Sequence, residues 1–453
     1  MNISRQFSKF IFELEYNELP QETIIKAKER ILDNLGAAVA GCISWTYREP
    51  FLAACKLLGE GSCGVIGDSE KKYPMARAAM INATYAEANE LDDGHIFASV
   101  HAGCVVVSTA LVMGAELHCS GRDIITSVVA GYEIVYRLGV AMCPHLIVKG
   151  FHPSSVLNTC GAVAVAGKLL GLNEEQLANA LGMAGMYGNG LMEATITGQQ
   201  TKCIMVGNAA ATGIMAVLFA KNGLPGALSV FEGQKGLFNT MSRDVDRDSV
   251  CQKLGKVFSI GDTYNKLYPT CRHGQAGIEA SLILHEEHDF MPDEIDSIHV
   301  GTYQIGVQLT GTIYEPKDQG EAKYSMPYGI ALVLTYGAIA PLYLNEEYYT
   351  KPELLSLAKK VTVSPDDSIQ REYPRKRGAR VRIQMKNGMF FEKTLFSLRG
   401  SPEVPVGWDV LEKKFVANCT PFLGNNEAKN MGLQIQSLES ESDISDIYKK
   451  LCI

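Results

Sequence analysis

Two long apolar runs place the strongest constraint on how this chain can fold. Residues 104–117, CVVVSTALVMGAEL, and residues 207–223, GNAAATGIMAVLFAKNG, are apolar on most faces of a helix. Helices of this kind are normally buried among other helices rather than laid on a protein surface. The two runs therefore predict a bundle with helices in its interior.

Helix start signals accompany these runs up to about residue 260. Pro20 precedes residues 21–41, QETIIKAKERILDNLGAAVAG, in which apolar residues recur every three or four positions until Gly41. The segments Ser120–Asp123 and Asn173–Gln176 have the pattern of capping boxes, and each opens an apolar run. This part of the chain is predicted to be helical.

The pattern changes after about Lys266. Strands are predicted at residues 295–309 and 359–365, and residues 379–396 form two alternating runs about Asn387-Gly388, a strong hairpin signal. From residue 408 onward the pattern is helical again. We therefore predict a mainly α fold, in which a large all-helical domain of residues 1–264 and 399–453 contains an inserted, smaller α+β domain of residues 265–398.

The composition excludes some classes of function. The chain has 453 residues, a net charge of −8 and 20% charged residues. It therefore lacks the excess positive charge that would attract nucleic acid. The N-terminus has acidic residues where a signal peptide needs an apolar core, and we expect no run of about 18 uncharged apolar residues that would span a membrane. A cytoplasmic protein without nucleic-acid or membrane partners is expected. The 12 cysteines include no Cys-x-x-Cys pair and are predicted to be reduced.

A glycine-rich run at residues 182–190, GMAGMYGNG, resembles a dinucleotide-binding fingerprint. That fingerprint follows a strand, whereas a predicted helix precedes this run. Close packing of helices is the preferred interpretation of these glycines.

The segment ELDDGHIFASVH, residues 90–101, holds three carboxylates and two imidazoles in apolar surroundings. His95, His101 and one of Asp92 and Asp93 could bind a metal, but their spacing matches no familiar ligand pattern. We therefore predict no metal site. A proton-transfer site remains open, as does a structural role in which Asp92 or Asp93 caps the buried helix that follows.

Other polar residues lie in apolar or glycine-bounded segments. They are His152 in GFHPSSV, Lys202 in GQQTKCIMVGNAA, Lys266 and Arg272 in NKLYPTCRHGQAG, and Tyr328 in KYSMPYGIAL. Taken singly, each has an ordinary structural explanation, such as a surface lysine or a histidine that is satisfied beside a proline.

Taken together, these segments resemble the MmgE/PrpD family, which includes 2-methylcitrate dehydratase, cis-aconitate decarboxylase and iminodisuccinate epimerase. The resemblance covers nearly the whole chain and rests on five segments in the family's order: ELDDGHIFASVHAG, GFHPSS followed by GAVAVAGKLLGL, TKCIMVGNAAATG, KLYPTCRHGQAGIEA and AKYSMPYGIA. It implies a homodimer, a cleft between the helical domain and a smaller α+β lid domain as the active site, and no metal or organic cofactor.

The resemblance also implies site residues. The family's histidine after the aspartate run corresponds to His101, and its His-Pro histidine to His152. Its lysines correspond to Lys202 and Lys266, and its lid tyrosine to Tyr328. The sequence departs from the family at Gly94, where a threonine is common, at Ala102, where a proline is common, and at Cys271, where the decarboxylase branch has a histidine. Glu90 also replaces an aspartate.

The family reactions move a proton at a carbon next to a carboxylate, so the site must carry a proton and neutralise charge. His101 suits proton transfer because imidazole titrates near neutral pH, and Lys202, Lys266 and Arg272 would bind carboxylates. The candidate catalytic residues are His101, Tyr328, Asp93 and Lys202, and the candidate substrate-binding residues are Glu90, Asp92, His95, His152, Lys266, Cys271 and Arg272.

The expected function is a cofactor-independent lyase that acts on a small di- or tricarboxylate, either a dehydratase or a decarboxylase of the 2-methylcitrate/cis-aconitate type. The alternatives are an epimerase of a related dicarboxylate such as iminodisuccinate, and a carboxylate-binding member of the family without activity. The motif does not choose among them, because the same histidine, tyrosine and cations can serve each reaction.

Overall fold

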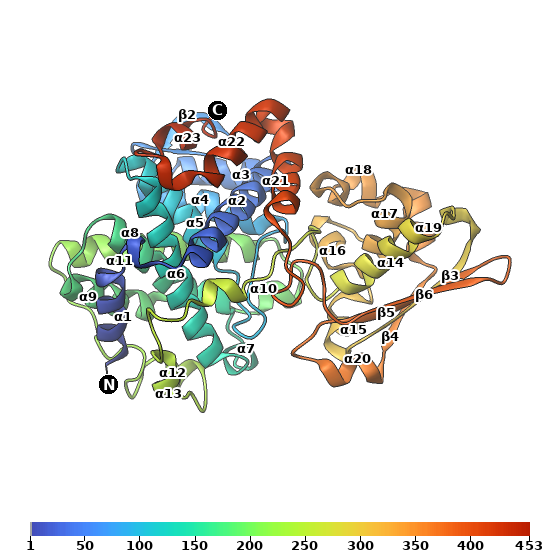
Figure 1. The fold of residues 1–453 in the computed structure, drawn as a ribbon, viewed down its shortest axis with the longest axis horizontal. Helices are drawn as coiled ribbons and strands as arrows, with labels where there is room; N and C mark the ends of the chain where they lie inside the picture. Colours follow the sequence, from blue (N-terminus) through green and yellow to red (C-terminus); the bar gives the residue numbers. More distant parts are fainter. Residues whose placement is uncertain (1) are drawn as a thin grey trace. The chain divides into compact units, whose positions relative to one another are not determined.

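The computed structural model describes residues 2–453 as two compact units (Figure 1). The first unit contains residues 2–88, 92–264 and 407–453, and the second contains residues 89–91 and 265–406. The chain is mainly helical, as predicted. The assignment of residues 265–398 to a lid domain stays a prediction.

The first unit is a helical bundle with α11 among its central helices. This helix packs against α4, α8 and α9, while α6 packs against α8. The C-terminal helix α21 returns to lie beside α2 (Figure 1). The helices of this unit are α1 Ile3–Glu13, α2 Gln21–Ser44, α3 Arg48–Lys56, α4 Met75–Ala88, α5 Gly103–Glu116, α6 Gly121–Met142, α7 His145–Val148, α8 Pro153–Leu169, α9 Glu174–Tyr187, α10 Glu193–Ile196, α11 Thr201–Lys221, α12 Leu237–Met241, α13 Arg247–Val250, α21 Trp408–Leu423, α22 Asn425–Gln436 and α23 Ser445–Lys449.

The predicted helix starts are confirmed. α2 begins directly after Pro20, and both capping boxes are present, with Ser120 paired with Asp123 before α6 and Asn173 paired with Gln176 before α9. Each box satisfies backbone N–H groups that have no partner within the helix. α2 continues past the predicted end at Gly41, since this glycine lies against α4 rather than at a helix terminus.

α11 contradicts the expectation that the chain has no run of about 18 uncharged apolar residues able to span a membrane, since its residues 203–220 carry no charged side chain, whereas α6 contains Glu133 and Arg137. By length and composition, both α6 and α11 could span a membrane. However, 83% of the most apolar window of α6 and 67% of that of α11 are buried inside the structure. Such burial is typical of the core helices of a globular bundle, in agreement with the buried helix predicted for residues 207–223.

The glycines of residues 182–190 pack closely, as predicted. A Cβ on Gly182 would lie 2.8 Å from the backbone nitrogen of Ala227, and one on Gly185 would lie 2.7 Å from Val230 Cγ2. Both glycines are in α9, so they allow the chain after α11 to approach this helix. The run belongs to helix packing and does not follow a strand.

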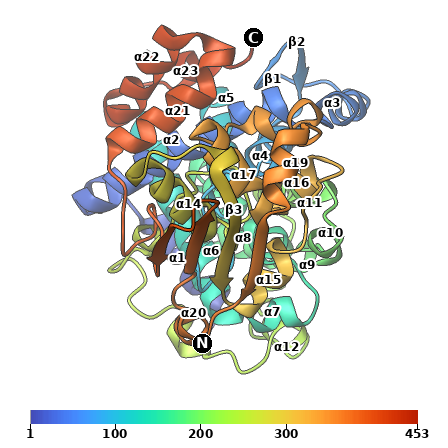
Figure 2. The same ribbon diagram turned by 90° about the vertical axis from the view of Figure 1, so that its right-hand side faces the viewer.

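The second unit is built on a four-stranded sheet of order β4-β3-β5-β6 (Figure 2). β3 Ile295–Thr302 pairs in parallel with β4 Val361–Pro365 and antiparallel with β5 Ala379–Met385, which forms the predicted hairpin with β6 Phe390–Leu395. Gly388 supplies the positive φ of 90° at the hairpin turn. A short hairpin in the first unit, β1 Cys63–Val65 with β2 Asp68–Tyr73, is separate from this sheet.

Helices cover the sheet and complete the core of the second unit. α14 packs against β5 and β6, and α17 packs against α14 and α19. The helices of this unit are α14 Gln275–Glu287, α15 Gln304–Thr310, α16 Gln319–Tyr324, α17 Met326–Tyr336, α18 Glu346–Tyr349, α19 Pro352–Ala358 and α20 Asp367–Glu372.

The prediction of one continuous strand over residues 295–309 is wrong in its second half. β3 ends at Thr302, and α15 begins at Gln304. Thr302 is opposite the last residue of β4 and the first residue of β5, so the chain beyond it has no strand partner. Without such partners, the backbone satisfies its polar groups by forming a helix, and the side chain of Gln370 accepts the N–H of Gln304 at 2.8 Å.

The contact of α2 with α4 should be sensitive to one methyl group. A Cβ on Gly41 would lie 1.9 Å from the carbonyl oxygen of Tyr85, a backbone atom that cannot rotate away. We expect Gly41→Ala to lower the free energy of unfolding by about 1–3 kcal/mol, as overpacked cores do. Denaturant unfolding of the purified protein measures this change.

Gly432→Ala in α22 is the matched control, because the nearest atom to its new Cβ is 3.7 Å away. This variant should be as stable as the parent or up to about 1 kcal/mol more stable, since alanine favours helix. Equal stabilities for the two variants would contradict the close α2–α4 contact.

Candidate active site

Asp93 joins the segment between α4 and α5 to three helices of the bundle. Its Oδ1 accepts the backbone N–H of Gly103, the first residue of α5, at 3.1 Å. Its Oδ2 accepts a hydrogen bond from the Tyr132 hydroxyl of α6 and one from the Asn34 amide of α2, the latter at 3.1 Å. The capping role considered for this acid is therefore present at the start of α5.

The carboxyl group of Asp93 is completely buried. Burial raises its pKa, and the nearby Arg30 guanidinium opposes this shift only in part, so the net direction is upward. The hydrogen bonds from Tyr132 and Asn34 also favour the charged form. Because three donors hold this side chain, it fixes the geometry of the segment that follows.

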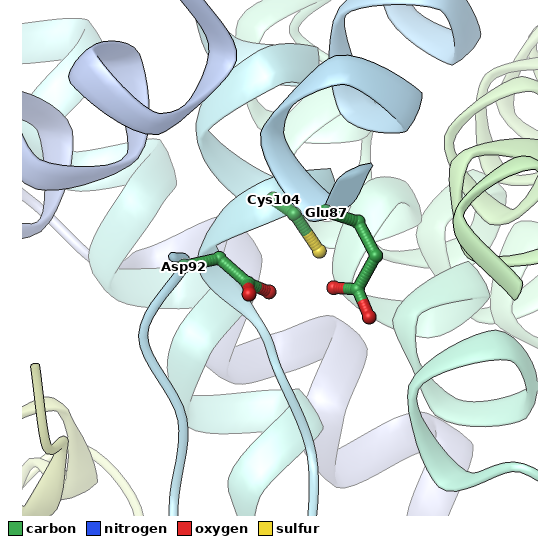
Figure 3. Close-up of side chains that lie close together, drawn as sticks. All are labelled: Glu87, Asp92 and Cys104. Carbon is green, nitrogen blue, oxygen red and sulfur yellow. The ribbon is translucent and has the colours of Figure 1, made fainter. Parts of the chain in front are cut away.

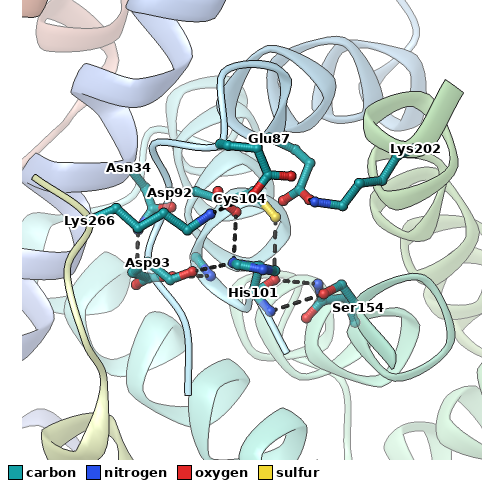
Figure 4. Close-up of polar contacts among 12 residues, drawn as sticks. Asn34, Glu87, Asp92, Asp93, His101, Cys104, Ser154, Lys202 and Lys266 are labelled. Carbon is teal, nitrogen blue, oxygen red and sulfur yellow. Dashed lines mark hydrogen bonds and ion pairs between the residues drawn. The ribbon is translucent and has the colours of Figure 1, made fainter. Parts of the chain in front are cut away.

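His101 is oriented by the main chain of Asp93 rather than by its side chain. The ring Nδ1 lies 2.6 Å from the carbonyl oxygen of Asp93 (Figure 4). A carbonyl oxygen can only accept, so Nδ1 carries the hydrogen and Nε2 holds the lone pair when the ring is neutral. Asp92 Oδ2 lies 3.4 Å from the same Nδ1, where it stabilises a protonated ring.

α8 positions the backbone of His101. The N–H of His101 donates to Ser154 Oγ at 3.0 Å, and its carbonyl accepts the Asn158 amide at 2.8 Å. The segment GFHPSS stands out in the sequence, but its pattern does not mark Ser154, and Asn158 lies beyond it. Their role depends on how α8 packs beside the segment, which no local pattern reveals.

Lys202 and Glu87 form a buried ion pair beside His101. Lys202 is the second residue of α11, and its Nζ lies 2.7 Å from Oε1 of Glu87 in α4 (Figure 4). Glu87 was missed by the sequence analysis because it lies inside the alanine-rich helix before the acidic segment. Burial and the neighbouring Asp92 carboxylate raise the pKa of Glu87, whereas the Lys202 ammonium lowers it, and the net direction is upward.

Glu87, Asp92 and Cys104 point toward one another (Figure 3). Their potential ligand atoms all lie within 4.8 Å, which is close enough for a metal ion. The chemistry of the donors fits a metal poorly. Burial raises the pKa of the Cys104 thiol well above its usual value, whereas a metal needs the thiolate, and the Lys202 ammonium already provides a cation beside Glu87.

His95 and His152 have local structural contacts. His95 Nδ1 accepts the N–H of Ala98 at 3.0 Å and so supports the tight turn in which Ser99 has a φ of 52°. Burial lowers the pKa of His95 to about 4. His152 precedes α8, and its Nδ1 lies 3.2 Å from Ser155 Oγ. Roles for these two histidines in substrate binding stay predictions.

Gly94, a departure from the family pattern, allows a close backbone approach. It pairs with Tyr264, donating its N–H to the Tyr264 carbonyl at 3.1 Å. A Cβ at this position would lie 2.5 Å from the Tyr264 hydroxyl oxygen and 3.2 Å from His101 Nδ1. A side chain at this position would therefore have to displace the Tyr264 ring, which lies next to His101.

The second unit contains the remaining candidates. Lys266 is fully buried, and its Nζ lies 2.9 Å from Oε2 of Glu90. The hydroxyl of Tyr324, which the sequence analysis did not select, donates to the other oxygen of Glu90 at 3.2 Å. Tyr328 instead donates to the carbonyl of Tyr343 at 2.7 Å, and burial raises its pKa. A catalytic role for Tyr328 stays a prediction.

Arg272 and Cys271 are also buried in the second unit. Arg272 donates to Ser401 Oγ at 2.6 Å and to Gln275 Oε1 at 2.9 Å. The backbone N–H of Cys271 donates to the carbonyl of Lys323 at 2.9 Å. These contacts fix the start of α14, and the predicted substrate contacts of both residues remain predictions.

Residues 5–249 match the MmgE/PrpD N-terminal domain, and residues 268–440 match the MmgE/PrpD C-terminal domain. The chain belongs to the MmgE/PrpD family. It is 25% identical to a cis-aconitate decarboxylase-like protein of Aspergillus oryzae over 98% of this chain and 96% of the relative. It is 27% identical to the human cis-aconitate decarboxylase over 98% of this chain and 93% of the relative.

A mitochondrial 2-methylcitrate dehydratase of Yarrowia lipolytica is 22% identical over 61% of this chain and 53% of that protein. Decarboxylases and dehydratases of this kind are lyases. The relatives therefore support a lyase, without fixing which bond is cleaved.

The buried ring of His95 makes the stability of the fold depend on pH. The unfolded chain binds a proton at this residue below about pH 6.5, whereas the folded protein does so only near pH 4. On lowering the pH from 7 to 4, we expect the parent to lose about 3 kcal/mol more unfolding free energy than His95→Asn. Denaturant titrations at a series of pH values measure the difference.

His118→Asn is the control, because His118 is exposed and pairs with Asp443. The His118→Asn variant retains His95, so between pH 7 and 4 it should lose about as much unfolding free energy as the parent does. Parallel pH profiles for the parent and His95→Asn would contradict the assignment of His95 as a buried, uncharged support of the turn.

Proposed function

We propose that the chain is a lyase that removes CO2 or water from a small polycarboxylate, with a decarboxylase of cis-aconitate type as the first candidate. The position of His101 carries the proposal. Its Nδ1 is held by the Asp93 carbonyl at 2.6 Å, and Asp92 lies 3.4 Å away, so Nε2 is the atom that can exchange a proton with substrate carbon. Lys202 supplies positive charge in the same unit.

In a decarboxylation, the bond between carbon and a carboxyl group breaks and CO2 leaves. The electron pair stays on the substrate, spreads into the remaining unsaturated acid, and is quenched by a proton delivered to carbon. His101 would deliver that proton from Nε2, because the Asp92 carboxylate stabilises the imidazolium that precedes the transfer. The remaining substrate carboxylates need cations, a role that suits Lys202.

The extent of the similarity favours decarboxylation. The decarboxylase relatives align along almost their whole length, whereas the dehydratase of Yarrowia lipolytica aligns over 53% of its length. Dehydration is the second candidate, and Cys271 favours it, because the decarboxylase branch of the family resemblance has a histidine there. Operation without a cofactor, the homodimer and the cytoplasmic location belong to the same proposal.

The test is proton NMR of the purified protein in D2O with cis-aconitate, citrate, 2-methylcitrate and related C4 to C6 acids. A decarboxylase gives a diacid one carbon shorter together with CO2, and a dehydratase gives new vinylic signals from a hydroxy acid. We expect His101→Ala to lower turnover about 100- to 10,000-fold, the usual contribution of a positioned proton carrier. His118→Ala, a change at an exposed histidine, should retain the parent's rate.

Turnover by His101→Ala at the parent's rate would contradict the assigned role of this histidine. Proton exchange at carbon without loss of CO2 or water would identify an epimerase instead. Ligand-dependent thermal stabilisation of the parent without any reaction of the bound acid would identify a binding protein. Each of these last two results would overturn the lyase proposal.

A further inference from the structure

The ion pair of Glu87 with Lys202 lies in a row of buried titratable groups that the sequence analysis only partly identified. Lys202 Nζ contacts Glu87 Oε1 at 2.7 Å, the carboxyl groups of Glu87 and Asp92 come within 4.8 Å of each other, and Asp92 Oδ2 lies 3.4 Å from His101 Nδ1. Figure 4 shows these four side chains converging from α4, α11 and the segment before α5. The row connects the cation to the proposed proton carrier.

The two carboxyl groups of this row cannot both ionise without a large cost. The side chains of Glu87 and Asp92 are completely buried, so water does not screen their repulsion. The 2.7 Å contact places the Lys202 ammonium beside Glu87, and the 3.4 Å contact places His101 beside Asp92. The two carboxyl groups therefore form a coupled pair with a different neighbour at each end.

We propose that Glu87 is a positioning residue that shares one proton with Asp92, and that the place of this proton sets the negative charge facing His101. With the proton on Glu87, Asp92 is a carboxylate and stabilises a protonated His101. With the proton on Asp92, Glu87 is a carboxylate that pairs with Lys202, and His101 faces a neutral acid. The pair thus adjusts to both protonation states of the ring.

Four groups that face Glu87 lie on the segment before α5, in α5 and in α11. They are Asp92 and His101 on the segment before α5, Cys104 in α5 and Lys202 in α11. Cys104 stays a neutral thiol, since burial and the acids around it raise its pKa well above the usual value. The upward direction of the pKa of Glu87 agrees with an acid that keeps a share of a proton.

The first test is the NMR titration of His101 in ring-labelled protein without substrate, with the signal assigned by comparison with His101→Gln. Glu87→Gln keeps the shape but leaves the whole negative charge on Asp92, so the pKa of His101 should rise by about one unit. Asp92→Asn leaves the charge on Glu87 beside Lys202, so the pKa of His101 should fall by about one unit. Glu87→Asp retains an acid that can share the proton, so it should shift the pKa of His101 less than either of the other two variants.

Glu133→Gln is the matched control. Glu133 is also fully buried and ion-paired, with Arg137 at 2.5 Å, but it lies in α6 outside this row. Its replacement should leave the pKa of His101 unchanged. Infrared difference spectra of the parent and Glu87→Gln provide a second readout, in which the carbonyl stretch of a protonated buried acid should change.

The kinetic readout rests on the proposed function, because it needs a substrate that turns over. The limb of the kcat/KM profile that belongs to His101 should shift with its pKa, upward in Glu87→Gln and downward in Asp92→Asn. Opposite NMR shifts in a protein that turns over no tested acid would support the shared proton and count against the lyase. Turnover of a tested acid without these NMR shifts would support the lyase and count against the shared proton.

An unchanged pKa of His101 in Glu87→Gln would overturn the proposal, because Asp92 would then carry the full charge in the parent. Shifts in the same direction in Glu87→Gln and Asp92→Asn would also overturn it. A stoichiometric metal in the purified parent that is lost in Glu87→Gln would replace the shared proton with a metal site. Should Glu87→Gln fail to fold, a pKa of His101 in Asp92→Asn at or above the parent's value would overturn the proposal.

Discussion

The hydrogen bond between His101 Nδ1 and the carbonyl oxygen of Asp93 is the contact on which the candidate site depends. It is short, at 2.6 Å, and it fixes both the orientation of the ring and the nitrogen that carries the hydrogen. The carbonyl can hold the ring because the side chain of the same residue is anchored in the bundle. One aspartate therefore transmits the packing of three helices to the proton carrier.

The buried charges around this contact are balanced locally. Arg30 offsets Asp93, and Lys202 offsets Glu87, so these two buried acids each have a cation near them. Desolvation makes these pairs costly to break, because removing one partner leaves a charge without compensation in a medium of low dielectric constant. In such surroundings, the position of a single proton changes the charge that a neighbouring imidazole experiences.

The helical bundle and the hairpin were predictable from local signals. Capping boxes at Ser120 and Asn173 and the turn at Asn387-Gly388 are decided by residues within four positions of one another. The end of β3 at Thr302 was not predictable, because it depends on where two partner strands stop. The alternating pattern beyond Thr302 is compatible with a strand, but no strand is there to pair with it.

The same distinction holds for the site. His101 and its acidic neighbours are close in sequence and were selected from it. Glu87 and Asn158 lie on other helices outside the quoted segments, and Ser154 lies in GFHPSS without any local signal of its contact with His101. The reason for Gly94 also lies outside its own segment, in the ring of Tyr264. Sequence reasoning finds the reactive groups, and the structure adds the residues that hold and tune them.

The central claim is that the carbonyl of Asp93 fixes the hydrogen of His101 on Nδ1, leaving Nε2 to meet the substrate. Nitrogen-15 NMR of ring-labelled protein above the pKa of His101 measures this tautomer directly, with His101→Gln identifying the signals. The account predicts a protonated Nδ1 and an unprotonated Nε2. A neutral ring with its hydrogen on Nε2 would contradict it, because Nδ1 would then have no hydrogen to donate to the Asp93 carbonyl.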